Sequence, residues 1–222
     1  MHVIQFSPEE WAIRSARLIQ DAVRAVCRQG GDCAVMLTGG RSAERLYRAW
    51  QALPDFDQLR GISFFFGDER CVQPDDPESN YGLVMRTLFA RGVPSGCSVI
   101  RMAAEDPDRE GACLHYEGRL PSKIDVLLLG VGEDGHIASL FPGGEALDEH
   151  TRKVVAVIGT KAPRARLTVT PRVIAHASSV FVLANGEAKA AVLRRVVDEA
   201  DNSHVLPACL VSHATWLLDT PF

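Results

Sequence analysis

The chain has 222 residues, of which 46% are hydrophobic and 23% are charged, and its formal net charge is −4. This composition is ordinary for a globular protein that buries a core. The slight acidic excess argues against a nucleic-acid surface or an anionic-membrane surface, because each needs a broad basic field. No apolar run approaches a membrane span, and no signal peptide is visible at the N-terminus. We therefore expect a cytoplasmic protein with no nucleic-acid or membrane partner.

The six cysteines form no C-x-x-C pair, and two of them, Cys33 and Cys209, lie in apolar runs typical of strands. Reduced structural thiols are therefore expected rather than a disulfide framework. A zinc site is disfavoured, because no Cys/His cluster has the spacing of zinc ligands.

The first half of the chain alternates between helical periodicity and short apolar runs. Ser7, Pro8 and Glu10 form an N-terminal capping pattern that predicts the start of a helix, and Gly30-Gly31 ends it. The predicted elements that follow are strands over Cys33–Leu37, Ile62–Phe66 and residues 125–129, and helices over residues 41–52, 81–89 and 107–119.

The second half repeats this alternation. Its predicted elements are strands over Val154–Ile158 and residues 167–170, 180–183, 205–212 and 216–218, with a helix over residues 187–199. Strands that alternate with helices of ten or more residues indicate βαβ units. No linker-like tract divides the chain, so the sequence predicts one α/β domain over residues 1–222, with a doubly wound, mainly parallel sheet and helices on both faces.

Asp134 and His136 follow the apolar run over residues 125–129, at what should be the carboxyl end of a strand. Open α/β sheets bind ligands at such ends, and a carboxylate beside an imidazole suits water activation. The segment also matches the dinucleotide pattern G-x-G-x-x-G, but Glu133 and Asp134 would place negative charge against a pyrophosphate. The alternative reading is a turn in which Asp134 caps the backbone and His136 is merely exposed.

Thr38-Gly39-Gly40-Arg41-Ser42 joins a predicted buried strand to a predicted helix. Such a turn exposes the first N–H groups of the helix, whose dipole favours an anion. The Gly-Lys-Ser/Thr ending of a Walker A loop is missing, so we expect one phosphate or carboxylate rather than a nucleoside triphosphate. A purely structural turn is the alternative.

Three further groups of charged residues are candidates for the site. Asp68-Glu69-Arg70 closes a predicted strand, either as a solvated rim or as part of a cleft. Lys189 lies in the first turn of a helix, where a cation opposes the dipole unless it helps to hold an anion. Arg164 and Arg166 flank a strand start, which is more typical of surface. No G-x-S-x-G elbow is present, which favours direct attack by water over an acyl-enzyme.

Taken together, these segments resemble the 6-phosphogluconolactonases of the pentose phosphate pathway, along the whole chain. The matching segments are Thr38-Gly-Gly-Arg-Ser, Asp68-Glu69-Arg70 followed by Ser79-Asn80, Leu129-Gly-Val-Gly-Glu-Asp134-Gly-His136-Ile-Ala-Ser-Leu-Phe-Pro142, Arg166-Leu-Thr168-Val-Thr170, Gly186-Glu-Ala-Lys189 and the ending Trp216-Leu-Leu-Asp219. The resemblance implies a Rossmann-like fold. It also implies hydrolysis of 6-phospho-D-glucono-1,5-lactone to 6-phosphogluconate without metal or bound cofactor, in a monomer or a homodimer.

The resemblance further implies roles for individual residues. His136 would be the general base, Asp134 would orient its imidazole, and Arg70 would stabilise the developing oxyanion. The phosphate would lie on the Gly-Gly turn, with Arg166 (or Arg164) and Lys189 as cationic clamps. The residues implied to bind substrate are Gly39, Gly40, Arg41, Ser42, Asp68, Ser79, Asn80, Arg166 and Lys189.

Three other functions remain as alternatives. A glucosamine-6-phosphate deaminase or isomerase should read Asp-Gly-His-Ile-Ala-Phe-Asn-Glu, but this chain has Phe141 in place of that glutamate. A non-catalytic sugar-phosphate sensor should carry a DNA-binding module, and the residues before Cys33 have room for one helix only. An unrelated esterase is disfavoured by the missing serine elbow.

Overall fold

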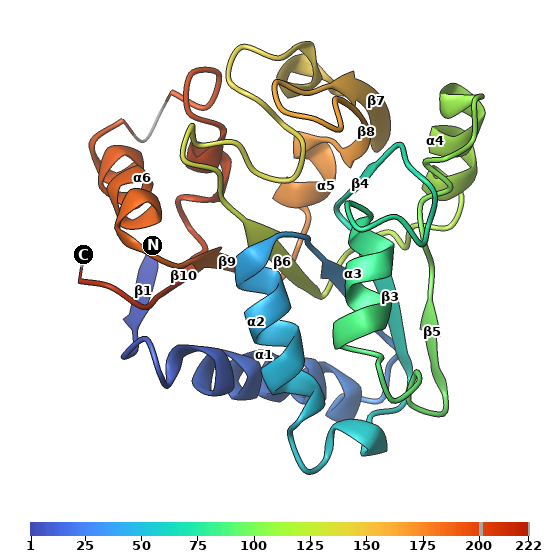
Figure 1. Cartoon of the computed structure of the whole chain (residues 1–222), viewed down its shortest axis with the longest axis vertical. Coiled ribbons are helices and arrows are strands. Elements are labelled where there is room, and N and C mark those ends of the chain that lie inside the picture. Colours follow the sequence, from blue (N-terminus) through green and yellow to red (C-terminus); the bar gives the residue numbers. More distant parts are fainter. Residues whose placement is uncertain (200–201, 222) are drawn as a thin grey trace.

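A seven-stranded parallel sheet forms the centre of the molecule, as seen in the computed structural model, which describes residues 1–199 and 202–221 (Figure 1). Its spatial order is β1-β10-β9-β6-β2-β3-β5. The strands are β1 (His2–Gln5), β2 (Cys33–Leu37), β3 (Ile62–Phe66), β5 (Cys97–Val99), β6 (Val126–Gly130), β9 (Ser179–Ala184) and β10 (Thr215–Leu218). The chain runs outward from β2 to β5 and then returns to β6 on the other side of β2. This reversal confirms the predicted doubly wound, mainly parallel α/β sheet.

Helices cover both faces of this sheet, as predicted. On one face lie α1 (Trp11–Arg28), α2 (Arg41–Gln51), α3 (Asn80–Thr87) and the short η1 (Phe56–Gln58). On the other lie α4 (Arg109–Glu117), α5 (Pro171–Ala175), α6 (Glu187–Asp198) and the short η2 (Glu145–Asp148) and η3 (Pro207–Val211). None of the helices that the structure describes is long and apolar enough to span a bilayer.

The central strands read as continuous apolar runs because both of their faces are buried. In β2, the side chains of Val35 and Leu37 pack into the core under α1 and α2, whereas Met36 packs into the core on the opposite face. Trp11 and Trp50 fill the first of these cores, and both are fully buried. The central strands are therefore held by a hydrophobic core on each face of the sheet.

A second, three-stranded antiparallel sheet lies beside the main one, in the order β4-β8-β7. Its strands are β4 (Asp68–Arg70), β8 (Ala165–Val169) and β7 (Val154–Ile158). The sequence predicts β7 and β8 but neither β4 nor a separate sheet. Only Gly67 separates β4 from β3, and its carbonyl accepts a hydrogen bond from Val169 N–H at 2.8 Å. The chain therefore leaves the main sheet at Gly67 and carries Asp68–Arg70 towards β8.

The predicted strand over residues 205–212 is wrong. The segment instead forms the 3-10 helix η3, with Pro207 at its start. The run is buried against α5 and α6 rather than placed between strands, and an apolar run of this length does not distinguish the two by periodicity. A smaller error concerns α1, which begins at Trp11. Ser7 Oγ accepts Glu10 N–H at 3.3 Å, so the predicted cap closes the turn before that helix.

The cysteines agree with the expectation of reduced thiols, since Cys27, Cys33, Cys71, Cys97 and Cys113 are free. Burial raises the pKa of Cys33 to about 12 and that of Cys113 to about 12. Both thiols therefore remain protonated and unreactive at neutral pH.

Candidate active site

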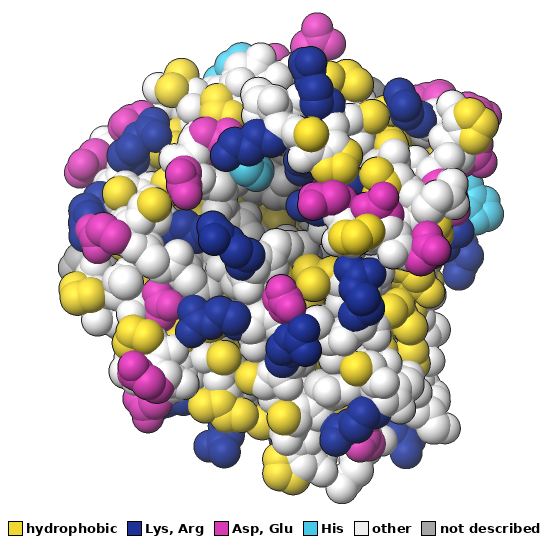
Figure 2. Space-filling model, in the orientation of Figure 1, with side chains coloured by type: hydrophobic (Ala, Val, Ile, Leu, Met, Phe, Trp, Pro, Cys, Tyr) yellow, Lys and Arg dark blue, Asp and Glu magenta, His cyan; other side chains and the backbone are white. Residues whose placement is uncertain are grey.

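The carboxyl ends of three adjacent strands, β9, β6 and β2, bring three loops together. The loops after β2 and β6 are joined directly, because Gly130 N–H donates to Thr38 Oγ1 at 3.2 Å. The strand order reverses between β6 and β2, which is where open α/β sheets bind ligands. Figure 2 shows the surface hollowed beyond the start of α2, with Lys, Arg, Asp, Glu and His side chains around the hollow.

The Gly39-Gly40 turn begins α2 with backbone N–H groups that no side chain caps. Gly40 has φ 92°, in the left-handed region that favours glycine. A Cβ on Gly39 would overlap the amide oxygen of Asn80. Tyr47 anchors the turn from behind, because its hydroxyl accepts Thr38 N–H at 3.0 Å and donates to Thr38 C=O at 2.8 Å. The turn is therefore rigid, with an open helix N-terminus suited to an anion.

Lys189 reaches this turn from α6, the helix that follows β9. Its Nζ donates to Ser42 Oγ at 3.0 Å. Burial lowers the pKa of Lys189, and the neighbouring Arg41 lowers it further. α6 also begins at a glycine without a side-chain cap, Gly186. The predicted pairing of Lys189 with the Gly-Gly turn is therefore present, and the lysine has no carboxylate within ion-pair distance among the described residues.

His136 and Asp134 form a hydrogen-bonded pair in the loop after β6. His136 Nδ1 lies 2.5 Å from Asp134 Oδ1. The hydrogen bond from His136 lowers the pKa of Asp134 to about 2. A carboxylate this acidic stays ionised at neutral pH, which places the proton on Nδ1 and leaves the lone pair on Nε2. Within the described residues no hydrogen bond to Nε2 is present, so that nitrogen is available to a water molecule or a substrate.

The loop geometry holds the imidazole tightly. Gly132 N–H donates to His136 C=O at 2.9 Å, which closes the turn. A Cβ on Gly132 would overlap both the His136 ring and the Asp134 carboxylate, so only glycine fits there. His136 is 24% exposed at its side chain, whereas the six other histidines are all exposed residues. His136 is therefore partly buried rather than fully exposed. Asp134 also accepts the backbone N–H of His136 at 3.3 Å, so the backbone cap of the alternative reading is present beside the pair of side chains.

Asp68, predicted as either rim or cleft, is buried. Its carboxylate accepts Ser139 Oγ–H at 2.7 Å and the Asn80 side-chain amide at 3.0 Å. Ser139 N–H in turn donates to Thr168 Oγ1 of β8 at 3.1 Å. Ser139 lies three residues after His136 in the same loop. Its contacts with Asp68 of β4 and Thr168 of β8 thus connect this loop to the second sheet.

Arg166 and Arg164 differ in how far they are buried. Arg166 is 7% exposed, and its Nη1 lies 3.4 Å from Ser139 Oγ, whereas Arg164 is exposed. Burial lowers the pKa of Arg166. Burial therefore favours Arg166 over Arg164 as the clamp, in line with the choice that the resemblance implies, whereas local position alone suggested a surface role for both arginines.

Three other predicted residues have structural contacts. Ser79 caps α3 by accepting Gly82 N–H at 3.0 Å and donates to Glu69. The buried carboxylate of Glu69 also accepts the backbone N–H of Asn80 at 2.7 Å. Arg70 contacts Glu78, with its Nη1 3.8 Å from that carboxylate. No hydrogen bond or ion pair of the described residues joins Arg70 to His136 or Asp134, so its catalytic role stays a prediction.

Ser139 and Gly132 shape the site but were not singled out as candidate residues, and Glu69 was considered only as part of the group Asp68-Glu69-Arg70. Ser139 and Gly132 lie inside the longer segment Leu129–Pro142 that surrounds Asp134 and His136, and the length of that segment was a signal for them. The burial of Glu69 had no signal, because the sequence does not distinguish a buried carboxylate from an exposed one. Within the part of the chain that the structure describes, no cluster of three or more His, Cys, Asp or Glu side chains is placed to hold a metal ion.

Comparison with known proteins gives a consistent family. The family model for glucosamine-6-phosphate isomerases/6-phosphogluconolactonase matches residues 7–218. The 6-phosphogluconolactonase of Rattus norvegicus is 36% identical over 96% of this chain and 88% of its own length. That of Mycobacterium tuberculosis is 36% identical over 89% of this chain and 87% of its own length.

Solved structures agree. A 6-phosphogluconolactonase of Thermotoga maritima superposes with a TM-score of 0.83 at 25% identity, over 98% of each chain. That of Trypanosoma brucei gives a TM-score of 0.83 at 26% identity, over 98% of this chain and 95% of its own. The sequence, the doubly wound sheet and the loops at its carboxyl edge thus lead to one conclusion: the chain belongs to the family of glucosamine-6-phosphate isomerases and 6-phosphogluconolactonases.

Proposed function

We propose that this chain hydrolyses 6-phospho-D-glucono-1,5-lactone to 6-phospho-D-gluconate in the oxidative branch of the pentose phosphate pathway. Relatives that are 36% identical over most of both chains carry the name 6-phosphogluconolactonase. The single observation that carries the mechanism is the His136–Asp134 pair, with Nδ1 2.5 Å from the carboxylate and Nε2 open. An imidazole that is held by a carboxylate at Nδ1 and has a free Nε2 can act as a general base.

In this mechanism Nε2 of His136 removes a proton from a water molecule as the water oxygen attacks C1 of the lactone. Asp134 stabilises the imidazolium that forms and keeps the ring in one orientation. The tetrahedral intermediate then collapses, and protonated His136 donates its proton to the departing ring oxygen. No covalent enzyme intermediate is needed, because a lactone is already an activated ester and requires only positioning and proton transfer.

The phosphate provides the remote anchor that holds C1 over His136. We assign it to the N-terminus of α2, at Gly39, Gly40, Arg41 and Ser42, with Lys189 bonded to the same turn. Support comes from the uncapped N–H groups of α2 and from the contact of Lys189 Nζ with Ser42 Oγ. Arg166 acts as a second cationic clamp, since it is buried without a carboxylate partner among the described residues.

Other predicted residues take supporting roles in this proposal. Asp68 and Asn80 lie between the Gly-Gly turn and Ser139, and they serve as acceptors for sugar hydroxyls or as support for the loop. Ser79 supports α3. Arg70 stabilises the oxyanion only after its guanidinium leaves Glu78.

We also propose the setting in which the enzyme works. Residues 1–222 act as one domain, because the site draws on loops from β2 to α6. The free thiols fit a reducing cytoplasm. The enzyme works as a monomer or a homodimer on a small sugar-phosphate lactone, without a nucleic-acid partner.

The direct test measures acid release from 6-phosphogluconolactone generated in situ, beside unphosphorylated gluconolactone at the same concentrations. We expect rapid turnover of the phosphorylated lactone, with a kcat/KM at least about 100-fold above that of the unphosphorylated one, because remote binding energy positions C1. Equal kcat/KM for the two substrates would refute the phosphate anchor. Release of ammonia from glucosamine 6-phosphate, measured in parallel, would support the deaminase alternative.

A further inference from the structure

The aromatic ring of Phe141 contacts two groups of the site that come from different parts of the fold. Its centroid lies 5.0 Å from the centroid of the His136 ring, with the planes inclined at 41°. The guanidinium carbon of Arg166 lies 5.6 Å from the same centroid. One side chain therefore touches both the proposed general base on the β6 loop and the proposed clamp on β8.

Phe141 has little room to move. It is 9% exposed, and its carbonyl accepts Gly144 N–H at 3.0 Å. The ring lies against Gly159, where an added Cβ would come within 2.9 Å of Phe141 Cζ and 3.3 Å of Arg166 Nε. The absence of a side chain at Gly159 is therefore what lets the ring and the guanidinium lie together.

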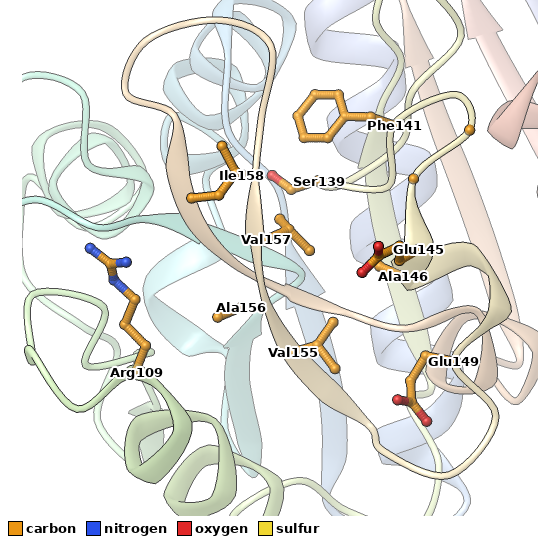
Figure 3. A pocket seen from close by; sticks show the side chains of 12 residues that line it. Arg109, Ser139, Phe141, Glu145, Ala146, Glu149, Val155, Ala156, Val157 and Ile158 are labelled. Carbon is orange, nitrogen blue, oxygen red and sulfur yellow. The ribbon is translucent and has the colours of Figure 1, made fainter.

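Phe141 also borders a cavity of which His136 and Arg166 are not lining residues. This cavity, of about 700 Å³, extends along β7 and is lined by Ser139, Phe141, Arg109 and residues 155–158, among others (Figure 3). In that view Phe141 and Ser139 lie at one side of the cavity and Arg109 at the opposite side. The ring thus stands at the border between the cavity and the His136–Arg166 groups.

We propose that Phe141 is a positioning residue for lactone hydrolysis. Its ring holds the His136 imidazole against Asp134, holds the Arg166 guanidinium in the site, and closes the side of the site that faces the cavity along β7. An apolar ring does this without competing for the catalytic proton, because it offers neither a donor nor an acceptor. This inference rests on the proposed function, since it assigns to Phe141 the placement of that function's base and clamp.

The test compares Phe141→Leu with a matched control, Phe181→Leu. Both phenylalanines are 9% exposed, but Phe181 lies in β9 within the core. In Phe141→Leu we expect kcat to fall and KM to rise, so that kcat/KM drops on the order of 10²-fold, because misplacing reacting groups by about 1 Å has an effect of that size. Phe181→Leu should keep kcat/KM within about threefold, since it changes no group that positions the substrate.

A second readout does not depend on activity. Nitrogen–proton correlation spectra of the His136 ring should show one tautomer, protonated on Nδ1, in the wild type and in Phe181→Leu. Phe141→Leu should show both tautomers. Gly159→Ala keeps the phenylalanine at position 141, but its added methyl group would displace the ring. This variant should therefore shift the same signals and also lower kcat/KM.

Two failures are distinguishable. If wild type is active and His136→Gln is not, but Phe141→Leu matches Phe181→Leu in kcat/KM and in a single tautomer, then this inference is overturned and the proposed function stands. If His136→Gln keeps wild-type turnover, the proposed function itself fails, whatever Phe141 does.

Discussion

Arg70 and Arg166 lie directly opposite each other in the antiparallel strands β4 and β8. Like charges at such positions destabilise a sheet, so this pair works against the fold. Arg70 has Glu78 nearby, whereas Arg166 has no carboxylate within ion-pair distance in the described part of the chain. Arg166 donates to the backbone carbonyls of Pro163 and Lys161 and lies over the Phe141 ring, but no ion pair neutralises it, so an added anion would stabilise the two neighbouring cations. We interpret the pair as part of the binding site for the anionic substrate.

Replacing Arg166 should weaken substrate binding without lowering the stability of the fold. Arg166→Met should raise KM at least about tenfold, because a charge-assisted contact to the anion is lost. The melting temperature of the free protein should stay the same or rise, since the like-charge pair is relieved. Steady-state kinetics and thermal unfolding check both expectations. Arg70→Met serves as the comparison, and it should lower kcat more than it raises KM if Arg70 stabilises the oxyanion. An unchanged KM in Arg166→Met would remove Arg166 from the site.

If Lys189 holds the phosphate as proposed, substrate affinity should depend on pH in the alkaline range. Burial and Arg41 lower its pKa below 10.5, and the neutral amine cannot attract phosphate. Binding of 6-phosphogluconate, measured by calorimetry, should therefore weaken as the pH rises through this lowered value. Lys189→Arg should remove the alkaline loss, because a guanidinium stays charged, and Lys189→Met should bind weakly at every pH. The same alkaline loss in Lys189→Arg as in wild type would assign the titration to another group.

Two glycines of the β6 loop form a matched pair. A Cβ on Gly132 would overlap His136 and Asp134, whereas a Cβ on Gly130 would make ordinary contacts of 3.6 Å with Gly39 and 3.7 Å with Thr38. Gly132→Ala should therefore lower kcat on the order of 10²-fold by displacing the imidazole. Gly130→Ala should retain most of the activity. Equal kinetics in the two variants would contradict the placement of the His136 ring over Gly132.

Asp134 should contribute to stability in a defined pH range. Its pKa in the folded protein is about 2, below the ordinary 3.8, because His136 donates a hydrogen bond to the ionised form. A lowered carboxyl pKa stabilises the folded state above the unfolded pKa, and that stabilisation is lost as the pH falls through the folded pKa. The free-energy difference between wild type and Asp134→Asn, from denaturant titrations, should thus be largest above about pH 4 and shrink towards about pH 2. A constant difference across this range would contradict the pairing.

At neutral pH the Asp134→Asn variant should also lose catalytic activity. Asp134→Asn no longer stabilises the imidazolium, so kcat should fall on the order of 10²-fold with little change in KM. The melting temperature, recorded in parallel, separates this effect from unfolding.

The central sheet could be predicted from the sequence because its strands are buried on both faces. The ranges Cys33–Leu37 and Ile62–Phe66 match the observed strands residue for residue. The range Val154–Ile158 also matches, but it is β7 of the second sheet and is only partly buried. The edge strands β1 and β5 were missed, since His2–Gln5 is four residues long and half polar and Cys97–Val99 has only three residues. Such short segments become strands because they pair with a neighbouring strand, and their own sequence shows no strand pattern.

The positions of some candidate site residues were predictable for a related reason. His136, Asp134 and Lys189 stand at chain breaks after strands or at the start of a helix, where spacing indicates their positions. The burial of Arg166 was not predictable, because it depends on the second sheet that β4, β7 and β8 form. The contact of Arg70 with Glu78 likewise depends on how the loop before α3 folds back. Contacts between segments that are distant in the sequence produce no periodic pattern in the sequence, so they could not be predicted from it.

The rate of 6-phosphogluconolactone hydrolysis by His136→Gln tests the central claim most directly. Glutamine approximates the size of the imidazole but cannot accept a proton, so kcat should fall at least about 10²-fold while the melting temperature stays close to wild type. His213→Gln, at an exposed histidine, is the matched control and should keep full activity. Turnover by His136→Gln within a few-fold of wild type would contradict the account, because the water would then be activated by another group.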